Sequence, residues 1–201
     1  MLKLHLVRYK WSMVVSVVLF AVGVMLGTIN AEALQHLIAG EVDKLRQVSE
    51  NLSSSDHPEL SFFVFIFLNN AIKSVLVIWS GVMFGILPIL FLLLNGMALG
   101  FVVETNAQSG GDIGELIVKG LLPHGIIEIP ALLIACAYGL QFGVLVWRSI
   151  VRMGDRRKKQ SLEVEWKTFV RAAVGATFWV VILLGVAAII ESTLTFYLVQ
   201  N

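Results

Sequence analysis

The sequence has 201 residues, of which 57% are hydrophobic and only 14% are charged, and its mean hydropathy is +0.84. A soluble domain is usually about 45–50% apolar and about a quarter charged. The composition therefore indicates an integral membrane protein, and it argues against a soluble enzyme, a nucleic-acid-binding domain and a disordered chain. The only cysteine, Cys136, has no partner for an intrachain disulfide.

Apolar segments along the chain predict five membrane-spanning helices, because a span takes about 20 mainly apolar residues. The first follows a basic decapeptide, and its apolar run is longer than the core of a signal peptide, so we expect a retained anchor. The stretch 61–104 is too long for one crossing, and Pro88 marks the natural break. We predict one all-α membrane domain over residues 1–201, with spans at about 11–29, 61–84, 88–104, 124–147 and 172–198.

The distribution of Lys and Arg predicts the orientation of these spans. Three basic residues precede the first span and eight lie between the fourth and the fifth, which makes 11 of the 15 in the chain. With five crossings, both segments lie in the cytoplasm if the N-terminus does. The prediction is a multi-pass protein of the bacterial cytoplasmic membrane with its N-terminus inside and its C-terminus outside.

The predicted loops have different characters. Residues 30–59, expected outside, contain an amphipathic helix, because apolar residues recur there at spacings of three and four. Residues 105–123 contain a short amphipathic piece, which is either interfacial or re-entrant; re-entry requires shielding by protein or water. The basic run 156–159 is explained most simply as a topology determinant, and the same charge would attract anionic lipids.

Polar residues inside the predicted spans are the candidate functional residues, since an ionisable side chain in a membrane is costly. At 1.5 Å per residue, Glu128 and Glu191 lie about 8 and 10 Å below the outer surface, and the polar residues of the second span lie in neighbouring layers. The predicted polar centre consists of Asn69, Asn70 and Lys73 in the second span, Asn95 in the third, His124 and Glu128 in the fourth, and Glu191 in the fifth.

Three interpretations of this centre stay open. His124 and Glu128 lie at i and i+4 on one helical face, which suits zinc, and Glu191 would supply a third ligand. Alternatively, Lys73 forms a buried ion pair with Glu128 or Glu191 that fixes helix packing. In the third interpretation both carboxyl groups are protonated, because burial disfavours their charged form, and they belong to a proton or ion pathway.

Amides and glycines in the spans have simpler explanations. Asn69, Asn70 and Asn95 are expected to form hydrogen bonds between helices. Pairs of small residues four positions apart, such as Gly96 and Gly100, predict close helix packing and would also permit a homodimer.

Three segments of the sequence resemble the stage II sporulation protein M family, and the resemblance covers nearly the whole chain. They are Phe67-Leu68-Asn69-Asn70, the block Pro123-His124-Gly125-(x)2-Glu128-(x)-Pro130-Ala131, and the segment 187–195 with Glu191. The resemblance implies five spans and places Asn70, His124, Glu128 and Glu191 in the polar centre of the family. It also implies a component of the engulfment machinery of endospore-forming bacteria, although family members occur in organisms that do not sporulate.

The same resemblance implies a scaffold rather than an enzyme. Family members recruit two extracytoplasmic peptidoglycan hydrolases, the stage II sporulation D and P proteins, from the engulfing membrane of the mother cell. The expected partners are therefore these hydrolases and membrane lipids, with no nucleic acid. The alternative function is a small ion or proton transporter, or a metal-dependent membrane enzyme, built on the same His/Glu centre.

Overall fold

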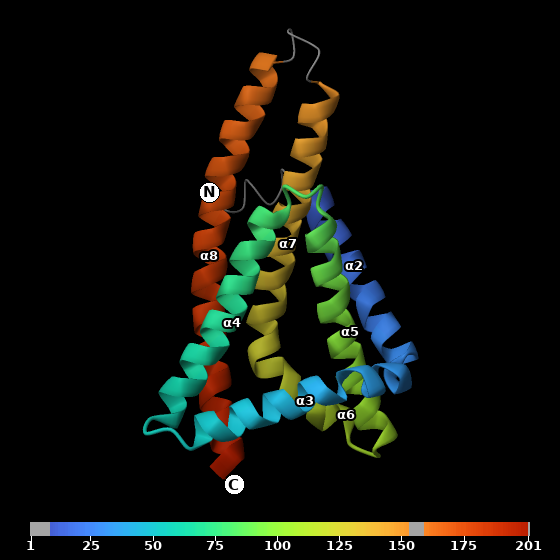
Figure 1. Cartoon of the computed structure of the whole chain (residues 1–201), viewed down its shortest axis with the longest axis vertical. Helices are drawn as coiled ribbons and strands as arrows, with labels where there is room; N and C mark the ends of the chain where they lie inside the picture. Colours follow the sequence, from blue (N-terminus) through green and yellow to red (C-terminus); the bar gives the residue numbers. More distant parts are fainter. Residues whose placement is uncertain (1–8, 153–158, 201) are drawn as a thin grey trace.

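The computed structural model describes residues 9–152 and 159–200, without the side chains of 36–46, 119–124, 159 and 194–200. Every regular element in these residues is helical (Figure 1). Five helices are long and apolar enough to span a membrane, which confirms the predicted class and number of spans. The elements are α2 (Lys10–Ile29), α3 (Ala31–Ser53), α4 (Pro58–Ser80), α5 (Ile86–Gln108), α6 (Ile113–Glu115), the π-helix η1 (Leu116–Leu121), α7 (Leu122–Val151) and α8 (Lys159–Gln200).

Helix α7 lies at the centre of the bundle. Its apolar window is 61% buried, against 17–33% for the other four spans, so it is the helix that the others cover. The pair α4 and α8 lies on one side of it and the pair α2 and α5 on the other (Figure 1). Ala131, Ala135, Gly139 and Gly143, spaced by four, are buried on α7 and let its neighbours approach closely.

The turn between α4 and α5 differs from the sequence expectation. Helix α4 ends at Ser80, four residues before the predicted end, and α5 begins at Ile86. Phe84 and Gly85 adopt left-handed backbone angles, with φ of 56° and 77°, so the turn itself ends α4. Pro88 lies in the first turn of α5, where a missing N–H is tolerated.

Helix α8 is longer than the predicted span, because it begins at Lys159 and not near residue 172. Its first turns pair with the end of α7 in a hairpin that projects beyond the rest of the bundle (Figure 1). The indole N–H of Trp166 donates to the Ser149 hydroxyl at 2.9 Å, and Arg152 donates to Glu165 at 3.0 Å. These two bonds join the arms of the hairpin.

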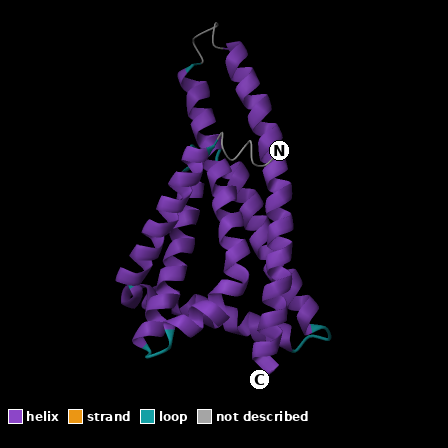
Figure 2. Ribbon diagram, turned by 180° about the vertical axis from the view of Figure 1, so that it is seen from behind, coloured by secondary structure: helices purple, strands orange, loops and turns teal. Residues whose placement is uncertain are grey.

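Helix α3 lies across the end of the bundle opposite the hairpin, where it contacts α4, α5 and α2; α6 and the C-terminal end of α8 are at the same end (Figures 1 and 2). The two connections that the sequence places outside, 30–59 and 105–123, are therefore at the same end of the bundle. The basic segment between α7 and α8 belongs to the other end. This arrangement agrees with the predicted topology, while the orientation in the membrane stays a prediction.

Cysteine labelling tests that orientation. Ser109 and Gln160 are exposed at opposite ends of the bundle, while native Cys136 is fully buried and should not react. In intact cells we expect a membrane-impermeant maleimide to label Ser109→Cys, and to label Gln160→Cys only after permeabilisation. The reverse pattern would place the basic hairpin outside.

Candidate functional site

A polar cavity of about 170 Å³ brings together five of the predicted centre residues. It is lined by Asn69, Asn70 and Lys73 from α4, Asn95 from α5 and Glu128 from α7. Side chains that are up to 59 positions apart in the sequence therefore meet at one depth. The cavity is large enough for several water molecules, each of which occupies about 30 Å³ in the liquid.

Helical spacing explains how α4 contributes to this cavity. Asn69 and Asn70 precede Lys73 by four and three residues, so all three side chains emerge within one turn. The side-chain amide of Asn69 donates to the Asn70 carbonyl oxygen at 3.2 Å. Ser74, which is 3% exposed, also lines the cavity; its position four residues after Asn70 was the sequence signal that could have identified it.

On α5, Asn95 is half-buried, and its side-chain amide donates to the backbone carbonyl of Phe91 at 2.7 Å. This bond uses one of the two side-chain N–H donors of Asn95. Amides and hydroxyls placed this way hydrogen-bond across helices, directly or through water.

Glu128 lies at the junction of two cavities. A second cavity, of about 240 Å³, is lined mainly by apolar side chains of α2, α5 and α7. It shares Asn95, Glu128 and Leu132 with the polar cavity. The half-buried carboxyl group of Glu128 thus lies between the α4–α8 side and the α2–α5 side of α7.

Glu191 is separated from the residues that line this cavity. It lies on α8, seven residues after the cavity-lining Leu184, which corresponds to about 10 Å along the helix axis. The common depth predicted for Glu128 and Glu191 therefore does not put their side chains around the same cavity. Glu191 itself is half-buried, next to buried Ser192.

The predicted zinc ligands are only partly described. His124 lies in the first turn of α7, but its side chain is outside the described residues. Among the side chains that are described, no group of three or more His, Cys, Asp or Glu is placed to hold a metal ion. Zinc held by His124, Glu128 and Glu191 therefore stays a prediction.

The described cavity is suited to two kinds of chemistry. Its amides, hydroxyl and charged groups come from α4, α5 and α7, so a hydrogen-bonded network, with water, would hold these helices together. The second kind is an ion pair. Lys73 is exposed at the cavity, and a cation in the middle of a span needs a partner or water. Glu128 is the acidic group that lines the same cavity.

Comparison with known proteins identifies relatives of the chain. Residues 16–196 match the family model of stage II sporulation protein M. An uncharacterized protein of Methanocaldococcus jannaschii is 24% identical over 187 residues, which cover 92% of this chain and 94% of that protein. No solved structure matches the chain.

Proposed function

The chain belongs to the stage II sporulation protein M family, and on that premise we propose that it is a non-catalytic membrane scaffold that recruits extracytoplasmic peptidoglycan hydrolases. It is a multi-pass membrane protein, and the family description supports a role in sporulation. The proposed partners are the stage II sporulation D and P proteins. The proposed location is the engulfing membrane of the mother cell.

The position of α3 is the observation that carries this proposal. Its 23 residues extend about 34 Å across the end of the bundle that the topology places outside (Figure 1). Glu32 and Glu50 are both exposed, and their separation of 18 residues is five full turns, so they lie on one face. Ala31 is buried and Leu52 is half-buried, so α3 packs on the bundle near both of its ends. Both described ends of this face are polar and exposed, and a helix that crosses the end of the bundle in this way is suited to a protein partner.

Zinc and a homodimer are further parts of the proposal. Zinc at His124, Glu128 and Glu191 would join α7 to α8 as a structural ion. The glycine faces of α2 and α5 pack against each other within the chain, so a homodimer would need a different surface.

A small ion or proton transporter is the second candidate, and the junction of two cavities at Glu128 favours it. A metal-dependent membrane enzyme would use the same carboxyl group. The candidates differ in the effect of Glu128→Gln. A scaffold that is held together by this group loses stability, whereas a transporter or enzyme keeps its fold and loses ion passage or turnover.

Replacing α3 tests the scaffold proposal. A Gly/Ser linker in place of residues 31–53 has a root-mean-square length of about 26 Å and extends to about 76 Å, so it can cover the roughly 34 Å that α3 spans between α2 and α4. We expect this variant to insert like the wild type, but to lose co-purification of the D and P proteins. Lys167→Gln, at the opposite end of the bundle, serves as the control and should retain both partners. A correctly inserted linker variant that still binds them would contradict the proposed role of α3.

A further inference from the structure

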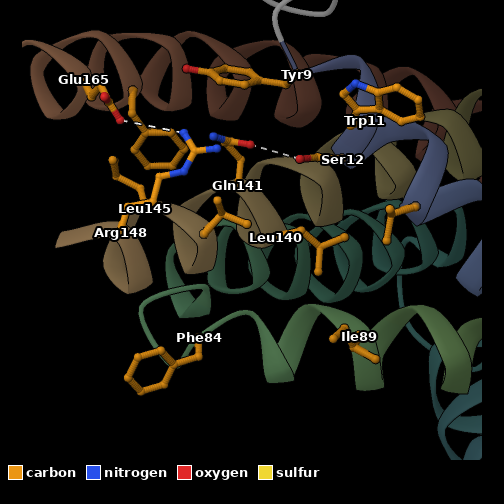
Figure 3. A pocket seen from close by; sticks show the side chains of 13 residues that line it. Tyr9, Trp11, Ser12, Phe84, Ile89, Leu140, Gln141, Leu145, Arg148 and Glu165 are labelled. Carbon is orange, nitrogen blue, oxygen red and sulfur yellow. Dashed lines mark hydrogen bonds and ion pairs between the residues drawn. The ribbon is translucent and has the colours of Figure 1, made fainter. Parts of the chain in front are cut away.

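A larger cavity, of about 660 Å³, opens at the end of the bundle that carries the α7–α8 hairpin (Figure 3). Side chains from α2, α5, α7 and α8 line it, together with Tyr9 and Phe84 beside the ends of the helices. Its volume lies within the 300–1,000 Å³ that is usual for sites of small ligands. Neither the polar centre nor the proposed partner surface uses it.

The cavity changes from charged to apolar with depth. Arg148 and Glu165 lie at its outer end, and Gln141 is seven residues before Arg148, about 10 Å deeper along α7. The Ser12 hydroxyl donates to the side-chain oxygen of Gln141 at 3.1 Å (Figure 3). Beyond this bond the lining is apolar and includes Val15 and Leu140. A ligand that fits must therefore have one polar end and one apolar end.

Positive charge is in excess at the outer end. The Glu165 carboxylate lies 3.0 Å from the Arg152 guanidinium and 3.8 Å from that of Arg148. Arg152 is therefore its closer partner, and the separation from Arg148 is longer than a hydrogen bond. The Arg148 side chain is 49% exposed, so its guanidinium donors can bind an anion. Phosphate oxygens match the planar fork of an arginine.

Aromatic residues place this outer end at the level of lipid headgroups. Trp11 is 73% exposed and Trp147 is 61% exposed, and Lys10 lies 5.9 Å from the centre of the Trp11 ring. Exposed tryptophans in spanning proteins gather at the boundary between headgroups and hydrocarbon. Trp147 is adjacent to Arg148, whereas Trp11 is adjacent to Ser12, which bonds to Gln141 about 10 Å deeper. The two tryptophans therefore bracket the headgroup layer, with the Arg148 guanidinium at its outer part and the cavity beyond Ser12 and Gln141 at the depth of acyl chains.

We propose that this cavity binds one anionic phospholipid, with its phosphate on Arg148 and an acyl chain against Val15 and Leu140. The charge at the outer end, the apolar lining below it and the aromatic residues at the boundary all match this ligand. Basic sites between spanning helices are a known way of recognising anionic headgroups. The proposal is independent of the scaffold role, because it uses the opposite end of the bundle from α3.

Titration of the full-length protein in detergent with phosphatidylglycerol, followed by native mass spectrometry, tests the proposal. We expect one tightly bound lipid per chain, and at least about tenfold weaker binding to Arg148→Gln, since a charge-assisted contact is lost. Val144→Trp places a large ring in the cavity without changing its charge, and it should weaken binding similarly. Lys167→Gln, which removes a 73% exposed cation outside the cavity, should bind like the wild type.

Several outcomes would overturn the proposal. Phosphatidylcholine binding as tightly as phosphatidylglycerol would remove the role of the anionic headgroup. Glycerol phosphate binding as tightly as the lipid would make the site one for a free phosphate ester. Unchanged binding to Val144→Trp would place the acyl chain elsewhere; this variant also decides the matter if Arg148→Gln fails to fold.

Discussion

Gly100→Leu is expected to lower the free energy of unfolding by about 3 kcal/mol, because it forces α5 away from α2. A Cβ atom at Gly100 would meet the backbone carbonyl of Val24 and lie 3.0 Å from the backbone nitrogen of Thr28. Backbone atoms inside a helix cannot move aside as the end of a flexible side chain can. The measurement is thermal or denaturant unfolding of the purified protein in detergent.

The packing that this substitution disturbs is reciprocal. A Cβ at Gly23 would lie 2.6 Å from the Leu93 carbonyl oxygen, and one at Gly96 would meet the Phe20 carbonyl. Each helix thus places its glycines against the backbone of the other, which is how small residues spaced by four let spanning helices approach. No single glycine is sufficient for this contact.

Gly175→Leu is the matched control, because Gly175 is exposed on α8 and a Cβ there meets nothing within 4 Å. It should cost no stability, because no contact is disturbed and leucine has a higher helix propensity than glycine. If Gly100→Leu costs no more than this control, the close contact between α2 and α5 does not contribute to stability.

The glycine pairs also show how far the sequence could predict the fold. The spacing of Gly96 and Gly100 indicates a face that packs closely, but it does not identify the partner helix. Gly139 on α7 has the same kind of spacing, yet a Cβ there would meet Pro88 of α5 and Val77 of α4 at 2.6 Å. The choice of partner depends on helix rotation and on the left-handed turn at Phe84 and Gly85, which no hydropathy pattern encodes.

Helix α8 shows a second limit. Hydropathy identifies the segment that is apolar enough to cross a bilayer, and not the length of the helix that contains it. The charged segment 159–171 lies before the predicted span, but it contains strong helix formers such as Leu162 and Glu163. The Trp166 indole, which donates to Ser149 of α7, and Glu165, which accepts from Arg152 directly after α7, stabilise this extension outside the apolar span.

For the polar centre, the sequence predicts the depth of its residues in the membrane, but only partly which of them line the same cavity. Counting residues from the predicted ends of the spans puts Asn69, Asn70 and Glu128 at neighbouring levels, and the cavity brings them together. Glu191 has a similar predicted depth, but α8 places it beyond the cavity-lining Leu184. Depth follows from residue counting, whereas direction depends on helix rotation and tilt.

Glu128→Gln is expected to cost about 3 kcal/mol of stability if the carboxylate and Lys73 balance each other across the cavity. The substitution keeps the shape of the side chain but leaves Lys73 without a counter-charge inside a span. Lys73→Met should lower the stability by a similar amount, because it leaves the Glu128 carboxylate without a counter-charge. Lys167→Gln breaks an exposed pair with Glu163, at 2.7 Å, and as a control it should cost no more than about 0.5 kcal/mol.

The double variant of Lys73→Met and Glu128→Gln separates the interpretations of the polar centre. If the two side chains interact, the double variant is more stable than the sum of the single effects predicts, by about 1–3 kcal/mol. Additive costs would contradict the ion pair. Zinc bound by His124, Glu128 and Glu191 predicts a different pattern: elemental analysis would find metal in the wild type and in Lys73→Met, and none in Glu128→Gln or Glu191→Gln. Glu191 lies about 10 Å along α8 from the cavity-lining Leu184. If Glu191→Gln retained the metal, the metal would be bound without the Glu191 carboxylate.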